Sequence, residues 1–127
     1  MNLKKISILI NIIFFLYFAF QLLVFTDEFA LKNIGFFNHA VAGLAEIIGI
    51  IFLSFSLALI VIFFKGSDKQ LPLFLTIFLV QFIIGMNFLR YVITNSPGES
   101  SLYNISLNAA VFLLTSAITL YILVKNN

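Results

Sequence analysis

Glu46 and Arg90 are the side chains best suited to chemistry, because each is an ionisable group inside a long apolar run. A charge near the bilayer centre costs about 2.5–3.5 kcal/mol on insertion scales unless another group pairs with it. The sequence therefore predicts that Glu46 and Arg90 are partners. Two interpretations remain open for such a pair, a structural ion pair and a site that binds an ion or a ligand.

Side-chain amides accompany these two charges in the same halves of the apolar runs. Counted at ~1.5 Å per residue from the run ends remote from the lysines, one polar residue on each run lies about 6 to 9 Å deep. We therefore expect a single polar layer, whose amides either form hydrogen bonds between helices or contact a ligand. The candidate intramembrane site comprises Glu46, Arg90, Asn87, Asn108, Gln21 and Asn104.

Helical spacing predicts which of these residues point inward. On the second run, small and polar residues recur at three- and four-residue steps, which is typical of membrane helices that approach closely. This stripe places Glu46 inside the bundle. The stripe consists of Ala42, Ala45, Glu46, Gly49, Leu53 and Ser56.

The other two polar runs are less alike. On the fourth run, Asn104, Asn108, Thr115 and Thr119 form a second stripe. On the third run, Asn87, Arg90 and Thr94 share one face, whereas Gln81 and Gly85 lie on another. Either face of the third run is a candidate for contact with another subunit.

Composition identifies the class of protein. The chain is 62% hydrophobic and 9% charged, far from the roughly 25% charged residues of soluble domains, so its main solvent is the lipid bilayer. Its basic residues are scattered, which argues against a nucleic-acid partner. Cysteine is absent, which excludes disulfides, thiolate catalysis and cysteine metal sites.

Four apolar runs are each long enough for the ~20 residues that a transmembrane helix requires. They cover residues 6–26, 40–64, 71–94 and 102–124, and a short interfacial segment covers residues 27–37. Short connections at Gly66–Asp68 and Asn95–Gly98 predict that consecutive helices are antiparallel neighbours. The predicted fold is all-α, an integral membrane up-down-up-down four-helix bundle.

The lysines predict the orientation of this bundle. If the helices alternate in direction, five lysines gather on one side: Lys4, Lys5, Lys65, Lys69 and Lys125. Lys32, Asp27, Glu28 and Glu99 then lie on the other side, with Arg90 in the membrane near them. The positive-inside rule therefore predicts that the N- and C-termini are cytoplasmic.

No motif indicates an enzyme. The sequence contains no Gly-rich phosphate loop, no hydrolase triad with its flanking residues and no HExxH motif. Glu46 has no second membrane carboxylate for acid–base work. His39, the only histidine, is expected to be a surface or capping residue rather than a metal ligand. We expect no catalytic residues, no metal and no cofactor.

Several segments resemble a known family. The stretches FTDEFALKNIGF, AEIIGIIFL, GMNFLRYVI and LNAAVFLL look like those of small DoxX-like four-helix bacterial membrane proteins of unknown function, over nearly the whole chain. Many relatives carry an Arg or an acidic-x-Arg motif where this chain has Ala45 and Glu46. The resemblance implies a four-helix fold and a location in the bacterial inner membrane.

Two functional classes follow from these observations. The first is a non-enzymatic accessory, assembly or structural protein of the inner membrane. The alternative is a subunit of an oligomeric small-solute or proton-coupled transporter or channel, with Glu46 as the coupled group. The partners expected are the lipid bilayer and either further copies of this chain or another membrane protein.

Overall fold

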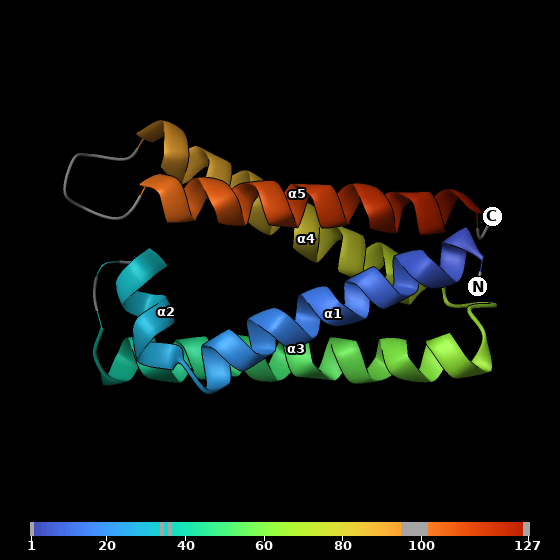
Figure 1. Ribbon diagram of the computed structural model, residues 1–127, viewed down its shortest axis with the longest axis horizontal. Coiled ribbons are helices and arrows are strands. Elements are labelled where there is room, and N and C mark those ends of the chain that lie inside the picture. Colours follow the sequence, from blue (N-terminus) through green and yellow to red (C-terminus); the bar gives the residue numbers. More distant parts are fainter. Residues whose placement is uncertain (1, 34, 36, 95–101, 126–127) are drawn as a thin grey trace.

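Four long helices and one short helix make up the computed structural model, which describes residues 2–33, 35, 37–94 and 102–125. The long helices are α1 (Leu3–Leu23), α3 (His39–Lys65), α4 (Leu71–Thr94) and α5 (Leu102–Lys125), and the short helix is α2 (Thr26–Asn33). The long helices alternate in direction (Figure 1). Each is long and apolar enough to cross a membrane, so the predicted all-α four-helix arrangement is confirmed.

Local sequence explains where several helices begin and end. The Asn2 and Asn38 side chains accept hydrogen bonds from the backbone N–H groups of Lys5 and Val41, and so cap α1 and α3. Gly66 ends α3 with φ +109°, a value that glycine adopts without strain. The predicted break at this position is therefore confirmed. The predicted loop Asn95–Gly98 and Glu99 lie outside the described residues.

Helix α1 is the central helix of the bundle. It crosses diagonally between α3 on one side and the α4–α5 pair on the other (Figure 1). The most extensive packing joins α4 to α5 and α1 to α3, followed by α1 to α5. Consecutive helices α3 and α4 share no extensive interface. The prediction that they are direct neighbours was wrong, because α1 separates them.

Two glycines allow the closest helix contacts. A Cβ atom added at Gly49 would lie 2.8 Å from the Leu23 side chain, and so α1 and α3 approach closely there. A Cβ atom added at Gly85 would lie 2.8 Å from the Leu113 side chain, where α4 meets α5. Gly49 and Gly85 therefore allow close packing of α1 with α3 and of α4 with α5. For Gly49, this agrees with the small-residue pattern predicted on the second run.

Phenylalanine side chains fill the middle of the bundle. Phe14 and Phe18 of α1 both contact Phe112 of α5, with ring centroids 4.9 Å apart in each case. Phe15 of α1 packs edge-on against Phe52 of α3 at 5.2 Å. These rings form an aromatic layer that joins three helices, because aromatic pairs favour such tilted and edge-to-face contacts.

The two ends of the bundle differ in charge and construction. The start of α1, the end of α5 and the α3–α4 connection all lie at one end of the bundle (Figure 1). The five lysines named above gather there, and we call it the lysine end. Helix α2 lies at the opposite end, called here the α2 end. It packs against α1, α3 and α5 and buries Ala30 completely. The segment predicted to lie in the interface is thus also part of the bundle.

Candidate functional site

A pocket of about 200 Å³ lies at the α2 end, between α1, α2 and α5. It forms because α1 diverges from α5 toward this end and α2 bridges the gap (Figure 1). Its polar lining comprises Gln21, Lys32, Asn33, Asn104 and Asn108, and its apolar and aromatic lining comprises Tyr17, Phe18, Phe29, Leu107 and Val111. We call this the α2 pocket.

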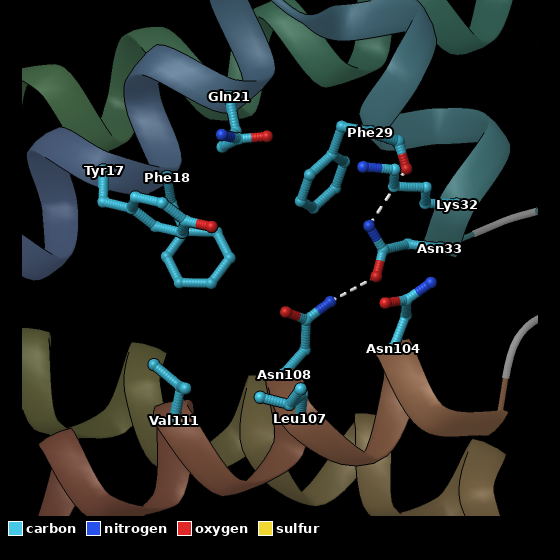
Figure 2. Close-up of a pocket in the computed structure, with 10 residues that line it drawn as sticks. All are labelled: Tyr17, Phe18, Gln21, Phe29, Lys32, Asn33, Asn104, Leu107, Asn108 and Val111. Atoms are coloured by element: carbon cyan, nitrogen blue, oxygen red, sulfur yellow. Dashed lines mark hydrogen bonds between the residues drawn. The ribbon is translucent and has the colours of Figure 1, made fainter.

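Hydrogen bonds hold the amide side of the pocket in place (Figure 2). The Asn108 side-chain amide of α5 donates to the side-chain oxygen of Asn33 at the end of α2. The Asn33 amide in turn donates to the carbonyl of Phe29 at 3.0 Å. This chain fixes the end of α2 against α5, so the pocket is preorganised from elements far apart in the sequence.

The chemistry of the pocket is that of a hydrogen-bonding and weakly cationic site. Gln21, Asn33, Asn104 and Asn108 supply both amide donors and carbonyl acceptors. Lys32, whose side chain is exposed, is the charged residue of the lining. The rings of Phe18 and Phe29 project into the pocket among these amides (Figure 2). Such a surface suits a molecule with a polar or anionic head and an apolar part.

A second polar cluster lies deeper, toward the lysine end. The Gln81 amide of α4 donates to Asn11 Oδ1 of α1 at 2.6 Å. The Thr119 hydroxyl of α5 lies 2.6 Å from Gln81 Oε1 and 3.0 Å from Asn11 Oδ1, so it can donate to either. The Asn11 amide donates to the carbonyl of Ser7 at 3.0 Å. We call Asn11, Gln81 and Thr119 the buried triad, because each is at most 1% exposed.

The buried triad is suited to structure rather than to binding. Each of its side chains has partners within the triad or on its own helix, and no buried side-chain nitrogen or oxygen in the described part of the chain lacks a partner. A fully satisfied polar network inside an apolar bundle fixes how the helices fit together. It joins α1, α4 and α5 at one level.

The structure corrects the prediction for Glu46. The side chain is exposed on the outer surface of α3. The buried face of α3 is instead Ala45, Gly49, Phe52, Ser56, Leu59 and Ile62. Because successive residues are separated by about 100° around a helix, Glu46 lies to one side of the buried Ala45. The predicted small-residue stripe is buried at Ala45, Gly49 and Ser56, but its acidic member is not.

The predicted ion pair between Glu46 and Arg90 is also absent from the described residues. Arg90 is exposed on α4, where its guanidinium donates to Asn87 Oδ1 at 3.3 Å and lies 4.9 Å from the Tyr91 ring. Of the two faces predicted on this helix, the one with Gln81 and Gly85 is buried, and the one with Asn87, Arg90 and Thr94 is exposed. The six predicted residues thus lie in three places: Gln21, Asn104 and Asn108 at the α2 pocket, Asn87 and Arg90 on α4, and Glu46 on α3.

Three of the six candidates do come together. Gln21, Asn104 and Asn108 all line the α2 pocket, as their similar depth predicted. The sequence interpretation missed Lys32 and Asn33, which α2 contributes to the pocket, and Asn11 of the buried triad. Ser7 and Asn11 at i, i+4 within an otherwise apolar run were the available signal for the triad. His39 is exposed at the start of α3.

Comparisons with protein-family models, with curated proteins and with solved structures give no match to this chain. The resemblance to DoxX-like proteins therefore stays a prediction.

Proposed function

We propose that the protein is a non-enzymatic accessory protein of the bacterial inner membrane that holds the polar head of an amphipathic molecule in the α2 pocket. The observation that carries this proposal is the joint lining of one pocket by four side-chain amides, a lysine and aromatic rings from three helices. Binding sites combine an apolar wall with a few placed polar groups in this way.

The size of the pocket favours a headgroup over a whole lipid. Its volume of about 200 Å³ is below the ~300–1,000 Å³ of pockets that enclose drug-sized ligands. The amides can hydrogen-bond to hydroxyl, carbonyl, phosphate or carboxylate groups, and Lys32 favours an anionic one. We therefore expect an anionic head in the pocket and an acyl or other apolar tail outside it.

Two observations argue against the transporter alternative. Glu46, the residue that it requires, is exposed on the surface of α3 and does not line the α2 pocket. The aromatic layer of Phe14, Phe18 and Phe112 lies between the α2 pocket and the buried triad. A polar solute in the pocket would meet this layer before it reached the polar groups nearer the lysine end.

Ligand binding in the pocket can be tested by identifying the molecule that remains bound when the protein is extracted. Asn108→Leu and Asn33→Leu each remove a polar partner from the pocket wall. Because a net hydrogen bond is worth about 0.5–1.5 kcal/mol, we expect ligand occupancy to fall up to about tenfold for either change. Native mass spectrometry of mildly extracted protein measures the mass and occupancy of the retained molecule.

Ser106→Leu is the matched control for this experiment, since Ser106 is exposed on the same helix and lies outside the pocket lining. It should retain as much ligand as the wild type. A wild-type protein that carries no discrete small molecule, or pocket variants that retain as much of it as Ser106→Leu, would contradict the proposal.

The orientation forms a further part of the proposal. The gathering of five lysines at one end of the bundle supports cytoplasmic N- and C-termini through the positive-inside rule. Reporter fusions after Lys69 and after Lys125 should therefore read as cytoplasmic, and a fusion after Gly98 as external. The α2 pocket would then face the periplasmic half of the membrane. An external reading after Lys125 would reverse this orientation.

A further inference from the structure

Glu46 is an acidic side chain on a surface that otherwise faces lipid. It is exposed on α3, and its neighbours Ile47 and Ile50 are each 55% exposed. Within the described ranges, no residue forms a hydrogen bond or an ion pair with the Glu46 side chain. A carboxylate in this position needs a partner from outside the chain, because hydrocarbon cannot solvate it.

Arg90 is a basic side chain on an exposed, largely apolar face of α4. It is exposed beside Met86 and Ile93, which are 45% and 76% exposed. Its guanidinium has the neutral partners Asn87 and Tyr91, and no ion pair of Arg90 occurs among residues 2–33, 35, 37–94 and 102–125. Both partners leave the positive charge uncompensated.

The two charges lie in the same part of the bundle. Glu46 is 46 − 39 = 7 residues from the start of α3 at His39, and Arg90 is 94 − 90 = 4 residues from the end of α4 at Thr94. Both helix ends are at the α2 end, so at ~1.5 Å per residue the two Cα atoms are about 10 Å and about 6 Å from it. Because side chains of a helix point toward its N-terminus, the Glu46 carboxylate lies nearer the α2 end than its Cα atom, and the Arg90 guanidinium, which reaches back to Asn87, lies farther from it. The two charges are therefore within a few ångström of one depth.

Helix α1 lies between α3 and α4 (Figure 1), and Glu46 and Arg90, both exposed, form no ion pair with each other within the described part of one molecule. We propose that Glu46 of one copy forms an ion pair with Arg90 of a second copy. Copies of one chain insert in the same direction, so they present the two charges at similar depths, and the long Arg90 side chain can span the difference. Opposite charges at similar depths are the property that selects a second copy as the partner.

The proposed contact joins two different faces, so it is head-to-tail. An open row of copies, whatever its length, would leave one Glu46 free at one end and one Arg90 free at the other. Closure of the row into a ring would pair every charge. The exposed isoleucines on α3 and the exposed Met86 and Ile93 on α4 would pack around the ion pair and exclude lipid from it.

Charge reversal in separate copies tests this pairing directly. Glu46→Arg alone places Arg against Arg90 of the next copy, and Arg90→Glu alone places Glu against Glu46. Each variant should therefore be monomeric by native mass spectrometry, whereas the wild type should be oligomeric. When the two variants are co-expressed with different tags, every contact between one variant and the other again joins opposite charges, and mixed oligomers in which the two alternate should form.

A cross-linking experiment leaves both charges in place. The chain contains no cysteine, so introduced cysteines are the only thiols. Ile47→Cys in one tagged copy should form a disulfide with Met86→Cys in another, because both residues are exposed and eight residues from the α2 end of their helices. Ile47→Cys paired with Ala110→Cys, which is exposed at the equivalent depth on α5, should cross-link at least tenfold less.

Several results would overturn the proposal. They are a monomeric wild type, the absence of mixed oligomers from the co-expressed charge variants, and equal cross-linking of Ile47→Cys to Met86→Cys and to Ala110→Cys. If the charge-reversal variants fail to accumulate when expressed alone, the cysteine pairs decide the question, since they retain Glu46 and Arg90. Pairing of Glu46 with a different membrane protein would appear as cysteine adducts of a foreign mass, and would also overturn it.

Discussion

Gly85→Leu should reduce the free energy of unfolding by about 3 kcal/mol, the upper part of the ~1–3 kcal/mol range for overpacking a well-packed interface. Even a Cβ atom at this position would lie 2.8 Å and 2.9 Å from two side-chain atoms of Leu113 and 3.3 Å from its backbone nitrogen. Because a backbone atom is among these contacts, a rotamer change of Leu113 alone cannot relieve them. We therefore expect α4 and α5 to separate.

The measurement for this prediction is reversible unfolding in mixed micelles, followed by helix content. Gly43→Ala is the control, because nothing lies within 4 Å of a Cβ atom at Gly43 and alanine favours a helix by about 0.8–1.0 kcal/mol over glycine. The control should be as stable as the wild type or more so. If Gly85→Leu has the same free energy of unfolding as Gly43→Ala, the close approach of α4 and α5 is contradicted.

The second large effect is expected at the buried triad. Asn11→Leu removes the acceptor of the Gln81 amide and leaves that buried N–H group without a partner. After Gln81→Leu, in contrast, Thr119 can still donate to Asn11 Oδ1 and the Asn11 amide to the carbonyl of Ser7. A buried polar group left without a partner costs about 1–3 kcal/mol, more than the ~0.6 kcal/mol average of a hydrogen bond between membrane helices. We therefore expect Asn11→Leu to destabilise the protein by about 1–3 kcal/mol, and Gln81→Leu to cost less, about 0.5–1.5 kcal/mol for the net loss of a hydrogen bond.

A triple variant separates the loss of a bond from the creation of an unpaired group. Asn11→Leu, Gln81→Leu and Thr119→Val together remove every member of the triad, so no side chain in it is left unsatisfied. Its unfolding free energy should be reduced by less than the sum of the single changes, and by no more than Asn11→Leu alone. Strictly additive losses would indicate that the three side chains do not act as a unit. Ser54→Ala, an exposed hydroxyl that bonds to its own helix, should be neutral.

Much of the fold follows from the length of the apolar runs. The second, third and fourth runs were predicted to within one residue of α3, α4 and α5, and the first was placed three residues late, since α1 covers Leu3–Leu23. The reason for success is that hydrocarbon requires helices of a fixed length. The helix neighbours did not follow from the sequence. Membrane helices are apolar on all sides, so periodicity does not indicate which helix covers which face.

The candidate site was predicted only in part, for a related physical reason. Depth was estimated from the sequence and placed all six candidates in one polar layer, of which only Gln21, Asn104 and Asn108 line the α2 pocket. The direction in which each side chain points is harder to predict from the sequence. Glu46 was predicted to point inward because the small and polar residues of the second run recur at three- and four-residue steps, yet of that stripe only Ala45, Gly49 and Ser56 are buried. Asn33 and Lys32 could not be assigned, since the docking of α2 between α3 and α5 depends on tertiary packing.

The most direct test of the α2 pocket as a binding site is site-specific photo-cross-linking in intact membranes. A photoreactive amino acid at Leu107, which lines the pocket, is compared with one at Leu114, which is 66% exposed on the same helix and outside the lining. At Leu107 we predict one discrete anionic amphipathic adduct by mass spectrometry, and at Leu114 the mixture of bulk membrane lipids. The same lipid mixture at both positions would contradict a selective α2 pocket.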